Sequence, residues 1–243
     1  MSDPSVSDLA RMAEATYHQN STASKGERFK KQNNDVKDLG YSVEEPHTNK
    51  HISTFRNGDT YVISHKGTDL HSKKKNVFQD LKNDFNILIG KDGNSSMTKK
   101  RTNKTKKIMK QIKKDNPNAE IHLTGHSLGA MTSYGATQDK YITKNITSLN
   151  TFNGGASPLF NSSIAHDKET KKRVKKISTH HHIDGDSISS GIKGNWVGKF
   201  KKYKSDKKPT HTKRVLSALS PVFNTLGKAK QTLESHSLKN FYN

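Results

Sequence analysis

Residues 121–130 read Ile121-His-Leu-Thr-Gly-His-Ser-Leu-Gly-Ala130, and Met-Thr-Ser-Tyr-Gly-Ala136 follows directly. The apolar run predicts a strand at 119–124, and the small residues after the second glycine can continue as a helix over 128–139. Between them lies Gly-x-Ser-x-Gly, the sequence form of a nucleophile elbow, in which a sharp turn lifts a serine hydroxyl clear of a sheet. The glycines flank the turn because side chains there would collide with the neighbouring strand and helix. We therefore expect Ser127 to be a nucleophile at the end of a strand.

Apolar residues elsewhere recur with the period of a strand in some segments and of a helix in others. Segments 51–56 and 60–64 flank Asn57-Gly58 and predict a β-hairpin. Helices are predicted at 5–18, 76–90 and 97–114, the last of them basic and amphipathic. Strands are predicted at 146–152 and 174–180. A loop is predicted at 19–35, and the Lys-rich stretch 193–214 has no clear element. Strands alternating with helices predict one α/β domain over 1–243, with a mostly parallel central sheet, flanking helices and an N-terminal hairpin.

The chain is strongly basic. Its formal net charge is +21, from 43 Lys and Arg against 22 Asp and Glu, and its isoelectric point is near 9.9. So positive a charge favours anionic partners such as acidic lipid surfaces or nucleic acid. Only 29% of the residues are hydrophobic, but their concentration in short runs indicates a folded sheet rather than disorder. The absence of cysteine excludes disulfides, a thiol nucleophile and zinc sites built on thiolates.

The sequence carries no signal for export or membrane insertion. No apolar run approaches the length that spans a bilayer. The first residues, Met1-Ser-Asp-Pro-Ser5, lack the charged and then apolar layout of a signal peptide. We therefore expect an intracellular or virion-associated protein that meets membranes only peripherally.

A serine hydroxyl is a weak nucleophile at neutral pH, so Ser127 needs a base and a group that orients that base. After an elbow of this kind, the acid comes next in the chain and the histidine last. Only His211 and His236 lie after an acid at the end of the predicted 174–180 strand. His211 lies in a charged segment, whereas the apolar Leu238 and Phe241 after His236 could anchor its loop, as could Tyr242. We favour His236.

The orienting acid is expected at Asp184 or Asp186. Both follow the predicted 174–180 strand directly, at the edge where an α/β sheet presents functional side chains. Asp186 precedes Ser-Ile-Ser-Ser-Gly, a run that turns back toward the sheet, and we prefer it to Asp184. Either residue could instead be a turn-forming Asp beside Gly185.

The charge that develops on a substrate carbonyl oxygen needs hydrogen-bond donors, which form an oxyanion hole. One donor is expected to be the backbone N–H of Leu128, the residue after the nucleophile. The second is expected from Thr68, which follows the 60–64 strand and offers both an N–H and a hydroxyl. The segment around Thr68 is equally typical of an ordinary strand-ending turn.

Clustered histidines at 180–182 raise the question of a metal site. Alternate residues of a strand point to opposite faces, so at most two of these side chains could share one ion. No second cluster completes a site, and we expect neither a metal nor another cofactor. His126, inside the elbow, is expected to pack or to form hydrogen bonds rather than to catalyse.

Four segments, in order, resemble the class 3 lipases, the fungal-lipase-like branch of the α/β-hydrolases. Tyr61-Val-Ile-Ser-His-Lys-Gly-Thr68 resembles the family's strand ending in aromatic-Arg-Gly-Ser/Thr, although His65-Lys66 replaces the aromatic-Arg pair. Asn76-Val-Phe-Gln-Asp-Leu81 resembles the segment around the lid, which would here be a Lys-rich stretch at 69–80. Ile121 to Ala130 resembles the family's elbow, and Gly185-Asp-Ser-Ile-Ser189 its acid site. The chain is also similar to compact lipase-like proteins of large DNA viruses.

The resemblance implies an α/β-hydrolase fold and a triad of Ser127, Asp186 and His236, with Thr68 and Leu128 in the oxyanion hole and no metal cofactor. It implies hydrolysis of ester bonds in acylglycerols or phospholipids, as by a triacylglycerol lipase or a phospholipase A1. Together with the charge, it leads us to expect a lipid esterase that prefers phospholipid at an anionic membrane surface. The alternative is a basic structural or virion-associated protein with the same fold that contacts anionic membrane or, non-specifically, nucleic acid through its Lys-rich runs.

Overall fold

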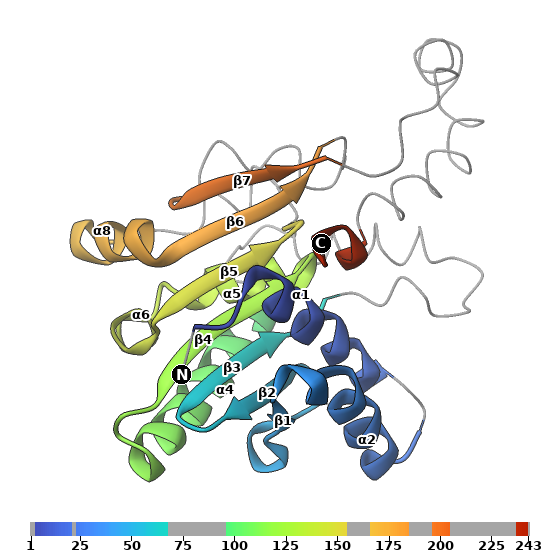
Figure 1. The fold of residues 1–243 in the computed structure, drawn as a ribbon. Helices are drawn as coiled ribbons and strands as arrows, with labels where there is room; N and C mark the ends of the chain where they lie inside the picture. Colours follow the sequence, from blue (N-terminus) through green and yellow to red (C-terminus); the bar gives the residue numbers. More distant parts are fainter. Residues whose placement is uncertain are drawn as a thin grey trace, which may run out of the picture.

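The computed structural model describes residues 3–20, 23–67, 96–154, 166–184, 196–204 and 237–242. Within these ranges seven strands form one sheet, and their order across the sheet follows the chain from β1 to β7 (Figure 1). β1 pairs with β2 and β2 with β3 in antiparallel fashion, and every neighbouring pair from β3 to β7 is parallel. The strands are β1 (Ser42–Val43), β2 (Ile52–Asn57), β3 (Thr60–His65), β4 (Glu120–His126), β5 (Ser148–Phe152), β6 (Ser178–Ile183) and β7 (Lys199–Tyr203). The predicted N-terminal hairpin and mostly parallel sheet are confirmed.

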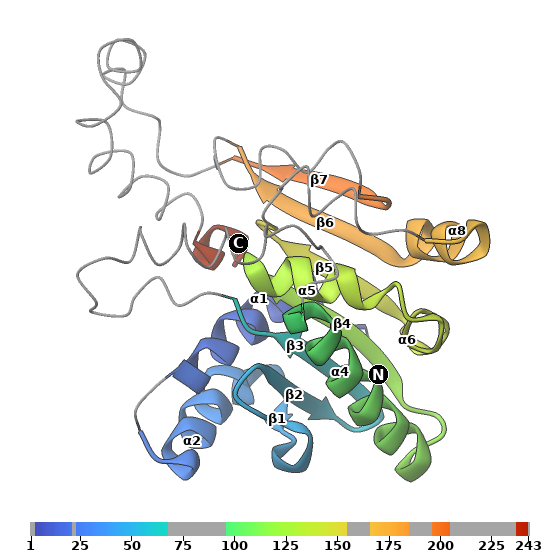
Figure 2. The ribbon, with the colours of Figure 1, turned by 180° about the vertical axis from the view of Figure 1, so that it is seen from behind.

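Helices cover both faces of this sheet (Figures 1 and 2). On one face lie α1 (Val6–Ala15), α2 (Lys25–Val36) and the short 3₁₀ helix η5 (Leu238–Phe241). On the other lie α4 (Ser96–Asp115), α5 (Leu128–Ala136) and α6 (Lys140–Asn145). The remaining helical segments are α8 (Lys168–Ile177), before β6, and the 3₁₀ turns η1 (Thr16–Asn20), η2 (Lys37–Leu39) and η3 (Glu45–His47).

The chain builds a separate apolar core on each face, and β3 contributes to both. Tyr61 and Ile63 pack in the core under α4 and α5, whereas Val62 between them packs in the core under α1 and η5. This alternation follows from the period of two in a strand. A strand buried on both faces is typical of the centre of an α/β sheet.

The basic helix predicted at 97–114 is α4. Its residues Ile108, Met109 and Ile112 are buried, and most of its lysines are exposed. Arg101, on the same helix, is buried, with only 5% of the residue exposed. None of the described helices has the length and apolarity needed to cross a bilayer.

The prediction of a loop at 19–35 is wrong, because α2 occupies Lys25–Val36. Ser24 begins the helix as a capping box: its hydroxyl accepts from the N–H of Glu27, and the Glu27 carboxylate accepts from the N–H of Ser24. Apart from Phe29 and Val36, the buried side of α2 is polar Gln32, which hydrogen bonds to the Ser53 hydroxyl of β2. Because a polar residue occupies the buried face, the apolar residues of this segment do not recur with a clear helical period.

One further prediction, in the C-terminal half of the chain, needs correction. The strand predicted at 174–180 begins only at Ser178, because the preceding residues belong to α8, which is capped by the Asp167 side chain. Within the Lys-rich stretch 193–214, for which the sequence predicts no element, Lys199–Tyr203 forms β7 at the sheet edge. The predicted helix at 76–90 and the presumed lid at 69–80 lie outside the described residues.

Candidate active site

The turn after β4 holds Ser127 in a strained backbone conformation. Its φ is 55° and its ψ −122°, a region that residues with side chains rarely adopt. The N–H of Ser127 donates to the carbonyl of Phe152, the last residue of β5, at 3.0 Å. The carbonyl of Ser127 accepts from the N–H of Met131 in α5 at 3.2 Å. Strand, strained serine and helix together have the backbone geometry predicted for a nucleophile elbow.

Both glycines of the motif are required by close contacts. A Cβ on Gly125 would lie 2.5 Å from the backbone carbonyl of Gly129. A Cβ on Gly129 would collide with the carbonyl of His65 in β3 and lie 3.0 Å from the N atom of Gly67. The first turn of α5 therefore approaches both β4 and the end of β3 more closely than any side chain allows.

Of the two residues expected in the oxyanion hole, the structure describes Leu128 but not Thr68. Leu128 is the first residue of α5, and the first N–H groups of a helix have no acceptor within the helix. Thr68 lies outside the described residues, but Gly67 before it packs against Gly129. The last described residue after β3 thus lies beside the first turn of α5.

His126 forms a hydrogen bond within the protein, as expected. Its Nδ1 lies 2.8 Å from the hydroxyl of Tyr17 in η1, and the two rings meet edge to face with centroids 5.9 Å apart. The histidine inside the elbow therefore ties β4 to the N-terminal helical segment.

Of the two acid candidates, only Asp184 lies within the described residues. Asp184 follows β6, and its carboxylate pairs with Lys202 of β7 at 2.8 Å, with both side chains more than half exposed. Its N–H donates to the carbonyl of Tyr203. Asp184 is thus held toward the β7 side of the sheet, and Asp186 lies two residues further along the chain.

The preferred base, His236, lies outside the described residues, as does His211, but the segment that follows His236 is described. The 3₁₀ helix η5 buries Leu238 and Phe241, as expected for an anchor. The Phe241 ring packs edge to face on Phe152, with centroids 5.0 Å apart. The carbonyl of Phe152 accepts from the Ser127 N–H. Phe152 therefore contacts both η5, through its ring, and the elbow, through its backbone.

Residues 61–185, which include β3, the elbow and the end of β6, match the family described as lipase (class 3). This match covers more than half of the chain. The chain belongs to the class 3 lipase family. Membership identifies it as a lipase-type ester hydrolase. No curated protein sequence matches it.

Solved structures of fungal lipases are similar to this class 3 lipase in fold. Lipase II from Rhizopus niveus is 16% identical, with a TM-score of 0.51 over 76% of this chain and 72% of that one. The lipase from Rhizopus microsporus var. chinensis is 14% identical, with a TM-score of 0.50 over 84% of this chain and 74% of that one. Likeness at this identity concerns the fold, and it confirms the α/β-hydrolase architecture.

The adjacent histidines of β6 have structural roles in this class 3 lipase. His180 contacts the Thr151 hydroxyl through Nδ1 and the Val197 carbonyl through Nε2, and burial lowers its pKa to about 4. His181 contacts the Tyr203 hydroxyl and the Asn150 side chain, and burial lowers its pKa to about 3. Both rings are thus neutral, with each nitrogen engaged by the protein.

Sequence reasoning missed His65 as a structural residue. His65 is fully buried, and its ring bridges the Thr105 hydroxyl of α4 at 2.7 Å and the Thr132 hydroxyl of α5 at 3.1 Å. Burial lowers its pKa to about 3, so the ring is neutral. The family's usual aromatic residue at this position is thus replaced by a polar link between β3 and two helices.

Within the described ranges, one group of side chains has the spacing of metal ligands. Asp3, Glu120 and the buried His122 place ligand atoms within 4.8 Å of one another. Glu120 begins β4, whereas the elbow follows the last residue of that strand. A cation held there would lie at the opposite end of the strand from Ser127.

Proposed function

We propose that this class 3 lipase hydrolyses lipid esters with Ser127 as nucleophile, His236 as base and Asp186 as the acid that orients the base. The observation that carries the proposal is the strained φ of Ser127 between two glycines that tolerate no side chain. Strain of this kind persists only where the surrounding structure enforces it, and it is concentrated at functional sites.

In the proposed reaction, the Ser127 hydroxyl attacks the acyl carbonyl while His236 takes its proton. The N–H of Leu128 and the N–H or hydroxyl of Thr68 stabilise the oxyanion of the tetrahedral intermediate. His236 then protonates the leaving alcohol, and water hydrolyses the acyl-enzyme by the same steps in reverse. Asp186 keeps the imidazole in the productive tautomer.

The described residues support this assignment through the register of the sheet. His126, Phe152 and His181 are paired across β4, β5 and β6, so the carboxyl ends of these strands lie at one edge of the sheet. Parallel sheets bind their ligands at this edge. The elbow, the segment after β6 and the anchored η5 all lie there, which supports a site assembled from the three.

We propose anionic phospholipid surfaces as the place of action of this single-domain enzyme. The net charge of +21 supports peripheral binding to them, since each Lys or Arg near such a surface contributes about 1 kcal/mol. The alternative of a structural protein that binds nucleic acid uses the same charge but gives no reason for the strained Ser127.

Replacing Ser127 by Ala tests the proposed nucleophile. We expect S127A to lose turnover of a p-nitrophenyl acyl ester by at least about 10³-fold, because no other group replaces the attacking oxygen. A fluorophosphonate probe should label the wild-type protein at Ser127 and leave S127A unlabelled. Ser42→Ala, on the edge strand β1, is the matched control and should keep both properties. Undiminished hydrolysis by correctly folded S127A would refute the proposal.

A further inference from the structure

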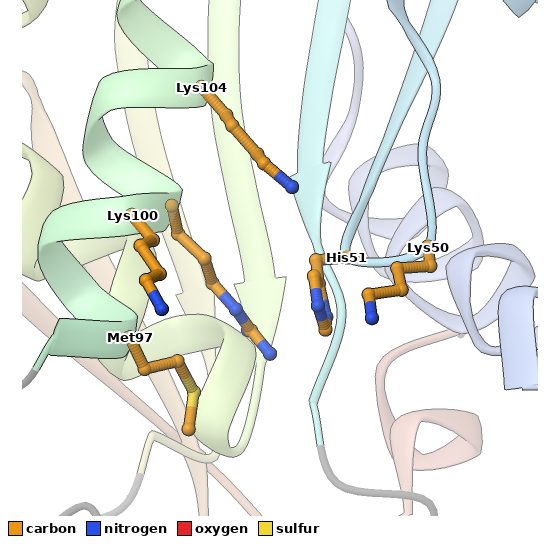
Figure 3. A pocket seen from close by; sticks show the side chains of 6 residues that line it. Lys50, His51, Met97, Lys100 and Lys104 are labelled. Atoms are coloured by element: carbon orange, nitrogen blue, oxygen red, sulfur yellow. The ribbon is translucent and has the colours of Figure 1, made fainter.

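A cavity of about 330 Å³ lies between α4 and the residues that precede β2 (Figure 3). Figure 3 shows Lys100 and Lys104 of α4 on one side and His51 and Lys50 on the other. Met97 and Arg101 complete the lining. The lining therefore holds four cationic side chains and no acid.

Arg101 is a buried cation whose charge is not balanced by a described acid. Its Nη1 donates to the carbonyl of Lys66 at 2.6 Å and to the hydroxyl of Thr132 at 3.3 Å. Burial lowers its pKa to about 10, which leaves it charged at neutral pH. Its Nε is buried and, among the described residues, has no hydrogen-bond partner. Burying a charge without a counter-ion is costly, and a bound anion would remove that cost.

His51 adds a second unsatisfied nitrogen to the same cavity. Its Nδ1 is buried and has no partner within the described part of the chain. Burial and the positive charge of Arg101 lower the pKa of His51 to about 4, so the ring is neutral at physiological pH. A neutral imidazole can donate one hydrogen bond to an anion without adding to the repulsion among the surrounding cations.

The cavity lies at the same edge of the sheet as the elbow. Ile52 of β2 pairs with His65 of β3, and the carbonyl of His51 accepts from the N–H of Lys66 at 3.0 Å. Gly67, the next residue, packs against Gly129 in the first turn of α5. Lys66, whose carbonyl Arg101 contacts, thus directly precedes the residue that packs against the helix turn after Ser127.

We propose that this cationic cavity binds the phosphate of a phospholipid headgroup while the acyl ester reaches Ser127. The inference rests on the proposed function and specifies its substrate class as anionic phospholipid. A guanidinium donates in a fork that fits phosphate oxygens, and lysines on a helix neutralise the remaining charge. A neutral acylglycerol has no anionic group to pair with these four cations.

The proposal is tested by calorimetric binding to S127A, which cannot turn the lipid over. The probes are short-chain phosphatidylglycerol below its micellar concentration, the diacylglycerol of the same chain length, and inorganic phosphate. The pocket variant K100Q/K104Q removes two exposed lysines of the cavity. K107Q/K114Q removes two exposed lysines of the same helix outside the lining and serves as the matched control.

We expect S127A to bind phosphatidylglycerol more tightly than the diacylglycerol or phosphate. Adding K100Q/K104Q should weaken that binding at least about tenfold, because charge-assisted hydrogen bonds are lost, and adding K107Q/K114Q less than about twofold. In the active enzyme, K100Q/K104Q should lower the ratio of kcat/KM for phosphatidylglycerol to that for the p-nitrophenyl ester. Equal losses in both lysine pairs, or equal binding of the two lipids, would overturn the proposal. Phosphate binding as tight as lipid binding would make the cavity a free-phosphate site instead.

Failure of this inference is distinguishable from failure of the proposed function. If the probe labels Ser127 but the cavity binds no phospholipid, the headgroup site is refuted and the hydrolase remains. If phospholipid binds the cavity but Ser127 is neither labelled nor needed for hydrolysis, the nucleophile is refuted and the binding site remains.

Discussion

Single atoms decide the geometry around Ser127. The carbonyl of Phe152 positions the Ser127 N–H, and the carbonyl of His65 leaves no space for a methyl group on Gly129. His65 itself is held by two threonine hydroxyls. The elbow is therefore supported by backbone and side-chain contacts from β3, β5 and α5 together.

Replacing Gly129 by Ala should destabilise the protein by about 1 to 3 kcal/mol, because overpacking of a close contact forces the backbone to shift. The shift would displace Leu128 and Ser127, so hydrolysis of a p-nitrophenyl ester should fall more than the folded fraction does. Urea unfolding and initial rates measure the two effects. Gly26→Ala, in α2 with no atom within 4 Å of the added carbon, is the control and should be neutral or stabilising. G129A with wild-type stability would contradict the contact.

Three buried histidines should make the fold sensitive to acid. The pKa values of His65 and His181 are lowered to about 3 and that of His180 to about 4, from an ordinary 6.5. The unfolded chain takes up protons at these residues below about pH 6.5 while the folded chain does not, so stability is fully present above that pH. The free energy of unfolding should fall by up to about 1.4 kcal/mol per pH unit for each histidine as the pH drops toward 4.

Urea titrations at a series of pH values between 7 and 4 measure this slope. His65→Gln should reduce it by about one proton, because one of the depressed pKa values is removed. A free energy of unfolding that is constant over this range would show that the buried rings do not titrate as described.

At the scale of elements, η5 is the part of the fold that connects the C-terminal segment to the active-site edge. Phe241 packs on Phe152 at the end of β5 and on Tyr203 at the end of β7, with ring centroids 5.0 and 5.1 Å apart. The proposed base precedes this helix directly in the chain. We therefore expect the position of His236 to depend on the aromatic contacts of Phe241 rather than on the elbow itself.

Phe241→Ala should cost about 3 to 5 kcal/mol of stability through the cavity it leaves. It should also lower kcat for a p-nitrophenyl ester by up to about 10²-fold, since small displacements of a catalytic group are that costly. Circular dichroism on heating and steady-state kinetics measure both effects. Tyr242→Phe is the neighbouring control, because the Tyr242 hydroxyl is buried without a hydrogen-bond partner among the described residues. Equal effects of the two substitutions would exclude a specific role for Phe241.

The elements that could be predicted from sequence are those with a strong local pattern. The hairpin of β2 and β3, the basic helix α4 and the unit of β4 and α5 each carry a clear period or turn signal. The helix α2 was missed because Gln32 occupies its buried face, and β7 because a Lys-rich edge strand has no regular alternation. In the candidate site, the elbow could be predicted because its chemistry is local. The proposed acid and base are far from the elbow in sequence, and residue order alone does not choose between Asp184 and Asp186 or between His211 and His236.

At the scale of the whole molecule, the net charge of +21 opposes compaction through self-repulsion. Seven ion pairs join described residues to one another, and two of them involve histidine. The whole sequence has 43 Lys and Arg against 22 Asp and Glu, so acids are too few to pair with every cation. The positive charge on which the proposed membrane binding depends therefore destabilises the isolated protein.

The melting temperature should therefore rise with NaCl, because the screening length falls from about 30 Å at 0.01 M to about 3 Å at 1 M. Replacing the exposed α8 lysines Lys171, Lys172, Lys175 and Lys176 by Gln should weaken this dependence by lowering the net charge by four. Differential scanning fluorimetry over a salt series measures both. A melting temperature that falls as NaCl is added would contradict dominant repulsion.

The strand order has a consequence for synthesis. Since neighbours in the sheet are neighbours in the chain, each strand from β2 to β7 joins an edge that has already left the ribosome. The elbow acquires its Phe152 contact once β5 has emerged, well before residue 236 is made. A nascent chain would thus carry the shaped turn of Ser127 without the proposed base, and if His236 is that base we expect no ester hydrolysis until translation has passed η5.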